Sequence, residues 1–146
     1  MRTPSHYNNK YFILFIDDFS RMTWVYFLKA KLEVFRVCNK FKAFVEKKSE
    51  KQIKVLRSNC GKEYTSRKFE KLCKDEGIER QLTVAYSPQQ NGVLERQNRT
   101  IMEMARSMLK EKSMPKNFWA EVVYSVVYIL NRCTTKAIQD KAPIEV

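Results

Sequence analysis

The run YFILFI, residues 11–16, constrains the fold more than any other stretch of this sequence. Six apolar residues in succession predict a short strand that is buried on both faces. Residues 17–21 are polar and favour a turn. The following run MTWVYFL, residues 22–28, is rich in β-branched and aromatic residues. The two runs therefore predict a β-hairpin.

The rest of the chain alternates between helical and extended patterns. Apolar residues recur at helical spacing over residues 31–51, and Ser66 and Gly77 are suitable to begin and end a second helix. The expected elements after the hairpin are, in order, a helix over 31–51, a strand over 53–58, a helix from Ser66 to Gly77, a strand over 78–84, the loop SPQQNG, a basic helix over 93–112 and a last helix after Pro115. This order predicts an α/β fold with a mixed sheet.

The chain of 146 residues suggests a single domain, residues 1–146, with room for a hydrophobic core. The apolar residues of 118–130 are interrupted by Glu121 and Ser125, so no segment is expected to span a membrane. The sequence contains no Gly-rich phosphate loop and no GxSxG motif, which argues against nucleotide-binding and hydrolase functions. No small-molecule substrate is expected.

The charge of the chain points to a polyanionic partner. Lys and Arg total 28 against 16 acidic residues, a formal net charge of +12. Such a field attracts nucleic acid, although a merely solvated basic surface is the alternative.

The four cysteines are scattered, with no CxxC pair, and the single histidine is His6. A zinc site is therefore not expected, and a reducing, intracellular compartment is the simplest inference. Cys60 lacks a nearby base, so a nucleophilic role for it is not expected either.

Two segments carry a family resemblance: LRSNCGKEY at 56–64 and YSPQQNGVLERQNRT at 86–100. Together with YFILFIDDFSRMTWVYFLK and NFWAEVVYSVVYILNR, they closely resemble the integrase catalytic core of copia-type retrotransposon Pol polyproteins. The four segments match in the right order and cover nearly the whole chain from Lys10 onward. The resemblance implies a ribonuclease H-like fold, here N-terminally truncated because the usual first, central strand is missing. Without that strand, segments 11–16 and 53–58 are expected either to pair with each other or to leave exposed sheet edges.

The resemblance also implies a catalytic site that holds Mg²⁺ or Mn²⁺ with three acids. Its last acid matches Glu95, which is then the remaining catalytic and metal-binding residue. The middle acid matches Asn59, and the first lies on the strand that is missing. Without the family resemblance, Asn59 would be interpreted as an ordinary turn or cap residue. The adjacent Asp17 and Asp18 are expected to serve the hairpin turn.

The same resemblance places the loop 87–92 and the helix after it against DNA. The residues expected to contact DNA are Gln90, Asn91, Arg96, Arg99 and Arg106, with a solvated basic helix face as the alternative. The family acts as multimers, which implies a homo-oligomer, and an integrase acts in the nucleus.

Three interpretations of the whole chain remain open at this point. One is an integrase core fragment, by descent a DNA strand-transferase but here inactive, because the first acid is absent and the second is Asn59. Another is a non-catalytic basic module that binds DNA or protein. A third is transposon debris without a function. Target-site specificity, oligomeric state and independent folding are not set by the sequence.

Overall fold

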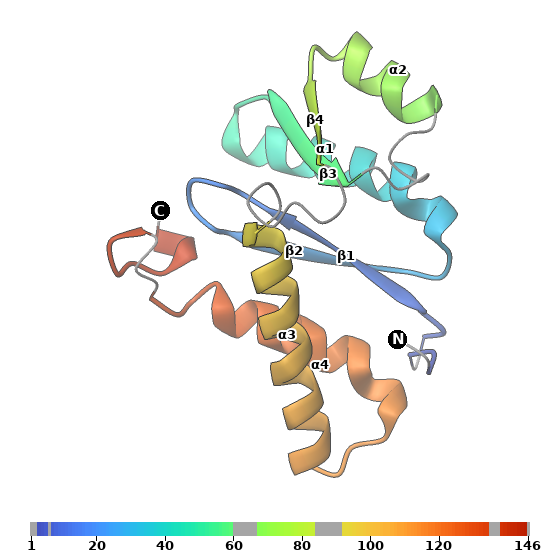
Figure 1. Cartoon of the computed structure of the whole chain (residues 1–146), viewed down its shortest axis with the longest axis vertical. Coiled ribbons are helices and arrows are strands. Elements are labelled where there is room, and N and C mark those ends of the chain that lie inside the picture. The colour runs from blue at the N-terminus through green and yellow to red at the C-terminus, as the bar shows by residue number, and fades with distance from the viewer. Residues whose placement is uncertain (1–2, 6, 60–66, 84–91, 135–137, 146) are drawn as a thin grey trace. The chain divides into compact units, whose positions relative to one another are not determined.

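The structure is a computed structural model that describes residues 3–5, 7–59, 67–83, 92–134 and 138–145. It divides into two compact units (Figure 1). The first combines Met1–Ala30 with Val93–Val146, and the second comprises Lys31–Gly92.

The first unit contains the predicted hairpin. Strands β1 (Tyr11–Ile16) and β2 (Thr23–Leu28) pair antiparallel, from Tyr11 opposite Leu28 to Ile16 opposite Thr23. The prediction that β1 is buried on both faces is too strong, since Ile13 alone in β1 is fully buried and Tyr11 is exposed. The reason is that, within the part of the chain that the structure describes, β1 pairs with β2 alone and does not lie in the interior of a wide sheet.

The core of the first unit lies between the hairpin and two helices. Helices α3 (Gly92–Glu111) and α4 (Trp119–Leu130) cover one face of the hairpin, and the short 3-10 helix η2 (Lys116–Phe118) precedes α4 (Figure 1). The Trp119 side chain is 1% exposed, and its ring centroid lies 6.2 Å from that of Phe12 and 5.9 Å from that of Phe27. An apolar stripe of α4 belongs to this core: Trp119, Val122, Val123, Val126 and Val127 are buried, and Leu130 packs against them. No helix in the described part of the chain is long and apolar enough to span a membrane.

A buried pair of side-chain hydrogen bonds joins the hairpin to the end of α4. The Asn131 Oδ1 atom accepts a hydrogen bond of 3.0 Å from the Thr23 backbone N–H. The Asn131 Nδ2 atom donates one of 2.8 Å to the Thr23 carbonyl. The Asn131 carbonyl in turn accepts from the backbone N–H of Ile144, in the 3-10 helix η4 (Pro143–Glu145). Asn131 therefore bonds to the first residue of β2 in the way that a neighbouring strand would.

The second unit contains a parallel strand pair and two helices. Strands β3 (Val55–Asn59) and β4 (Glu79–Thr83) pair in register from Val55 opposite Glu79 to Asn59 opposite Thr83. Helix α1 (Val34–Ser49) follows a 3-10 turn, η1 (Lys31–Glu33), and helix α2 (Arg67–Asp75) connects the strands. Phe35 of α1 meets Phe69 of α2 edge to face. β1 and β3 therefore belong to separate two-stranded sheets among the described residues. The direct pairing of segments 11–16 and 53–58, which was one of the two expected arrangements, is not observed.

Gly77 ends α2 as predicted. Its φ of +67° lies in the left-handed region that glycine adopts without strain. The backbone N–H of Ile78 then donates to the Cys73 carbonyl at 2.8 Å, which closes the helix end. Ser66, the expected first cap of this helix, lies outside the described residues.

An ion-pair network connects α1 to its surroundings in the second unit. The Lys42 Nζ atom lies 2.6 Å from Glu46 Oε1 and 3.2 Å from Glu76 Oε2. Glu46 Oε2 also accepts from the backbone N–H of Ile53 at 2.7 Å. Partial burial acts to raise the pKa of Glu46, but the hydrogen bonds from Lys42 and Ile53 outweigh it and hold that pKa below its usual value.

The Asn131 hydrogen bonds lead to a stability prediction. Replacing Asn131 by Ala leaves the Thr23 N–H and carbonyl buried without partners, so we expect the free energy of unfolding to fall by about 2–4 kcal/mol. Urea denaturation followed by circular dichroism measures it. Asn98→Ala makes the same chemical change at an exposed position of α3 and should cost less than about 1 kcal/mol. If the two variants lose the same free energy of unfolding, the hydrogen bonds between Asn131 and Thr23 do not stabilise the fold, and the prediction is wrong.

The Glu46 network leads to a prediction on pH. Because the folded pKa of Glu46 lies below its unfolded value, its ionised form stabilises the fold above the unfolded pKa. That contribution is lost as the pH falls through the folded pKa. We therefore expect Glu46→Gln to lose less stability than the unchanged chain between about pH 7 and about pH 3. Glu50→Gln, at an exposed position, is the control, and a Glu46→Gln profile parallel to it would contradict the prediction.

Candidate nucleic-acid interface

Helix α3 has two chemically opposite faces. Ile101 and Ala105 are fully buried against α4 and the hairpin. At about 100° per residue, the positions on the opposite side fall within roughly a third of the helix circumference. These positions, all exposed, are Glu95, Arg96, Arg99, Glu103, Arg106 and Lys110. We call this set the α3 basic face; it carries four cations and two acids.

The sequence of α3 explains why this helix forms and where its charges lie. Its residues are mostly good helix formers, with Glu95 in the first turn and Lys110 in the last. Both charges complement the helix dipole. The Gln97 Nε2 atom lies 3.4 Å from Thr23 Oγ1 and donates to it, which connects the first turns of α3 to the start of β2. The basic face is thus presented by a helix that is attached to the core of its unit.

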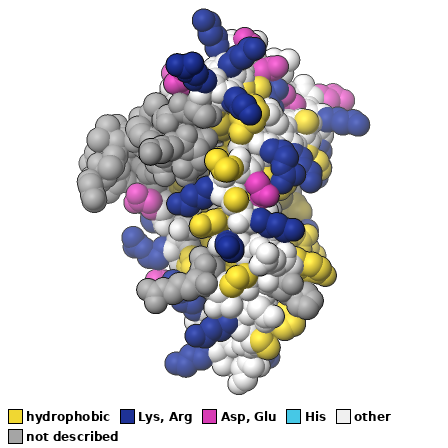
Figure 2. All heavy atoms as spheres, turned by 90° about the vertical axis from the view of Figure 1, so that its right-hand side faces the viewer, with side chains coloured by type: hydrophobic (Ala, Val, Ile, Leu, Met, Phe, Trp, Pro, Cys, Tyr) yellow, Lys and Arg dark blue, Asp and Glu magenta, His cyan; other side chains and the backbone are white. Residues whose placement is uncertain are grey.

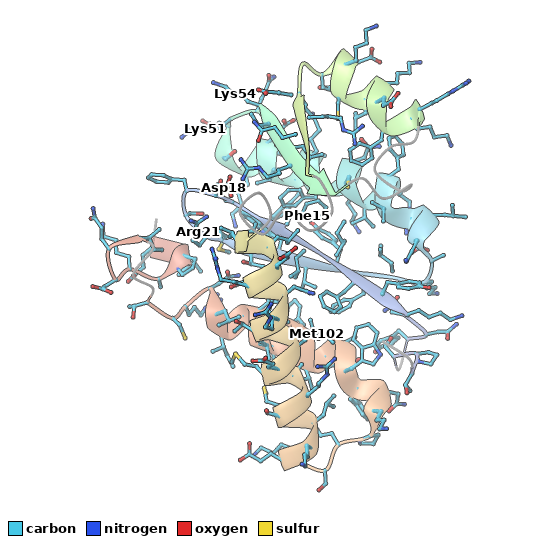
Figure 3. The ribbon with its side chains drawn as sticks, in the orientation of Figure 1. Phe15, Asp18, Arg21, Lys51, Lys54 and Met102 are labelled. Carbon is cyan, nitrogen blue, oxygen red and sulfur yellow. The ribbon has the colours of Figure 1, made fainter. Side chains whose placement is uncertain are left out.

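The described residues include most of the predicted DNA contacts. Arg96, Arg99 and Arg106 are exposed on α3, as the DNA interpretation requires. Gln90 and Asn91 lie outside the described residues. Lys110 was not among the predicted contacts, although its position four residues after Arg106 could have revealed it. Met102, in contrast, is half-buried at the border of the basic face (Figure 3).

The predicted catalytic positions lie in different units. Asn59 is the last residue of β3 in the second unit, and its backbone lies opposite Thr83. Glu95 lies in the first turn of α3 in the first unit and is exposed. The structure brings Glu95 together with the arginines of the basic face, whereas a joint site of Glu95 and Asn59 stays a prediction.

The acids of the hairpin turn are engaged in local contacts. Asp17 Oδ2 accepts hydrogen bonds from the Ser20 backbone N–H at 3.0 Å and from Ser20 Oγ at 2.7 Å. Asp18 lies 3.7 Å from Arg21 at the same turn (Figure 3). Within the described residues, no three His, Cys, Asp or Glu side chains are grouped as they would need to be to hold a metal ion.

The cysteines that the structure describes behave as packing residues. Cys38 of α1 and Cys73 of α2 are buried. Burial raises the pKa of the Cys38 thiol to about 12, with a further contribution from Cys73, so the thiolate form is strongly disfavoured. Cys60 lies outside the described residues.

Positive charge is spread over the face of the molecule that Figure 2 draws. The face drawn in Figure 2 shows Lys and Arg side chains along its whole length, with hydrophobic side chains between them. This distribution agrees with the formal net charge of +12 and adds a general attraction for polyanions to the local α3 basic face.

Comparison with known proteins establishes the family. The sequence model described as "Integrase core domain" matches residues 1–88. The chain belongs to the integrase core family. It is 48% identical over 143 residues to the retrovirus-related Pol polyprotein from transposon TNT 1-94 of Nicotiana tabacum, covering 98% of the chain and 11% of that protein. It is 33% identical to the corresponding polyprotein from transposon RE2 of Arabidopsis thaliana, over 94% of the chain and 9% of that protein. This integrase core therefore spans about a tenth of the length of these relatives.

Solved structures confirm the fold of the integrase core. A chain of the simian T-cell lymphotropic virus intasome in complex with a PP2A regulatory subunit superimposes with a TM-score of 0.73 at 15% identity, over 92% of this chain and 46% of the other. The HTLV-2 integrase catalytic core domain in complex with magnesium, in a trimeric form, gives 0.63 at 18% identity, over 91% and 81%. The predicted ribonuclease H-like fold and the predicted relationship to copia-type Pol polyproteins are both confirmed.

Proposed function

We propose that this integrase core binds DNA through the α3 basic face and does not catalyse strand transfer. The observation that carries the proposal is the placement of Arg96, Arg99, Arg106 and Lys110 on the exposed side of a helix whose other side is held by Ile101 and Ala105. An integrase core acts on DNA by descent, and the +12 charge of the chain favours the same partner.

The chemistry of this face suits phosphates rather than bases. Arg guanidinium groups bind phosphate oxygens in a bidentate way, and Lys adds a flexible point charge. Phosphate contacts fix position on the duplex without reading sequence. The interface is therefore expected to tolerate any DNA sequence and to weaken steeply with salt.

The residues at the family's metal positions do not suit two divalent cations. Two Mg²⁺ ions about 4 Å apart repel each other by roughly 17 kcal/mol at an effective dielectric constant of about 20, and anionic ligands must offset this. Glu95 supplies one carboxylate. Asn59 offers at most a neutral amide oxygen, whereas Mg²⁺ prefers carboxylate and phosphate oxygens. Asp17 is already engaged by Ser20. We therefore propose that this site binds divalent metal ions weakly.

The assembly and location of this integrase core follow from the same proposal. The superimposed retroviral structures are an intasome and a trimeric core. We propose that this chain also self-associates on DNA, and that it acts in the nucleus, where chromosomal DNA lies. A non-catalytic module retained for binding fits these features better than an active transferase does.

The DNA proposal is tested by charge reversal on the α3 basic face. Arg96→Glu and Arg99→Glu each replace a phosphate contact by a repulsion, so we expect the dissociation constant for duplex DNA to rise about tenfold. The slope of log affinity against log salt should fall by about one per contact removed. Fluorescence anisotropy with a labelled duplex at several salt concentrations measures both quantities.

Lys40→Glu is the matched control, because it makes the same charge change at an exposed position of α1 in the other unit. It should change the affinity for duplex DNA by less than about threefold, since Lys40 is not part of the α3 basic face and an exposed charge outside an interface is largely screened by salt. If all three variants weaken binding equally, the affinity comes from net charge alone and the α3 interface is refuted.

The loss of catalysis is tested with Mg²⁺ and Mn²⁺ in a cleavage and strand-transfer assay on duplex DNA ends. Because the family's middle acid position holds Asn59, we expect the chain to give no more product than its Glu95→Ala variant. Product that depends on the metal and disappears in Glu95→Ala would show that this integrase core is active.

A further inference from the structure

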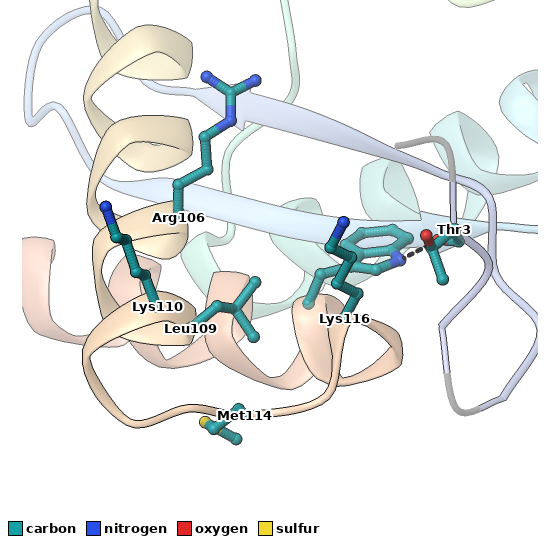
Figure 4. Close-up of a pocket in the computed structure, with 7 residues that line it drawn as sticks. Thr3, Arg106, Leu109, Lys110, Met114 and Lys116 are labelled. Carbon is teal, nitrogen blue, oxygen red and sulfur yellow. Dashed lines mark hydrogen bonds between the residues drawn. The ribbon is translucent and has the colours of Figure 1, made fainter.

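A pocket of about 420 Å³ lies in the first unit, away from Glu95 along α3 (Figure 4). Its walls come from the C-terminal half of α3, the connection to α4 and the N-terminal segment of the chain. The residues that line it are Thr3, Arg106, Leu109, Lys110, Met114, Lys116 and Trp119. Pockets of a few hundred Å³ are of the size that binds small ligands or the side chains of a partner.

The inner surface of the pocket is apolar. Leu109 and Met114 are half-buried and present aliphatic and thioether surface. Trp119 is almost fully buried, and its Nε1–H already donates a hydrogen bond of 2.7 Å to the Thr3 carbonyl. The indole therefore has no donor left for a ligand, and its ring is too deeply buried to stack on a nucleic-acid base.

The rim of the pocket is cationic. Arg106, Lys110 and Lys116 are exposed, and none of them forms an ion pair with any residue that the structure describes. Figure 4 shows the charged ends of Lys110 and Lys116 on the two sides of Leu109. Unpaired cations around an apolar hollow favour a ligand that combines negative charge with an apolar group.

We propose that this pocket docks an acidic peptide segment of a partner protein, with one large apolar side chain in the hollow and flanking carboxylates on the three cations. A DNA backbone would satisfy Arg106, Lys110 and Lys116 but would leave the apolar hollow in contact with water. A peptide with Leu or Phe between Asp and Glu residues satisfies both surfaces, because apolar burial and charge pairing then occur together. The proposal goes beyond DNA binding and shares only Arg106 and Lys110 with the α3 basic face.

The test is a binding titration of the whole chain with a short fluorescein-labelled peptide that carries Asp and Glu on both sides of a Leu-Phe pair. Lys110→Glu combined with Lys116→Glu should raise its dissociation constant at least about tenfold. Met114→Gln, a change of similar volume in the pocket wall, should raise it about threefold to tenfold by making the hollow polar. Thermal unfolding of each variant shows that the fold is kept.

Three controls decide the outcome. Lys112→Glu makes the same charge change at an exposed position outside the pocket and should leave peptide binding within about threefold. A peptide with Ala in place of Leu-Phe should bind at least about tenfold more weakly. The Lys116→Glu single variant should keep its affinity for duplex DNA, so that failure here is separable from failure of the DNA proposal. The proposal is overturned if the Ala peptide binds equally well, if Lys112→Glu weakens binding as much as Lys116→Glu does, or if Lys116→Glu weakens DNA but not peptide binding.

Discussion

The first unit depends on a side-chain amide that takes the place of a strand. Asn131 exchanges two hydrogen bonds with the backbone of Thr23 across 108 residues of sequence, and both residues are buried. An amide can do this because it carries a donor and an acceptor in one plane, as the peptide group does. The hairpin, the end of α4 and the start of α3 converge at this place, since Gln97 also donates to the Thr23 hydroxyl. The orientation of the α3 basic face therefore follows from a polar contact as well as from apolar packing.

The apolar side of the same unit is organised around Trp119. Its ring packs against both Phe12 and Phe27 of the hairpin, and its N–H donates to the Thr3 carbonyl. Ile101 and Ala105 of α3 are buried in the same core cluster as the apolar residues of α4. Because these contacts use only one side of α3, the opposite side is free to carry arginines at little cost to stability. Positive charge and core packing are thus separated on a single helix.

The sequence predicted those features of the fold that depend on local residue patterns. The hairpin, the helices and the stop at Gly77 follow from periodicity and turn residues within short windows, and the exposed positions of Arg96, Arg99 and Arg106 follow from helical spacing. The pairing of β3 with β4, apart from β1 and β2, was not predicted, because strand partners are chosen by long-range contacts. The Asn131 contact was not predicted either, since an asparagine after an apolar helix looks like an ordinary cap. The pocket requires Thr3 to meet Trp119, which no local pattern reveals.

The contacts that hold this fold differ from the groups that catalysis would need, so a chain can keep the fold without being catalytically active. Asn59 ends a strand, and its backbone lies opposite Thr83. Because main-chain hydrogen bonds make this pairing, a carboxylate in place of the amide is expected to leave it unchanged, but the amide lacks the negative charge that two metal ions would need. The contacts that hold the first unit, at Trp119 and Asn131, are independent of that charge. The loss of a metal ligand that we propose would therefore place no strain on the packing that presents the α3 basic face, and the proposed DNA contacts do not depend on catalysis.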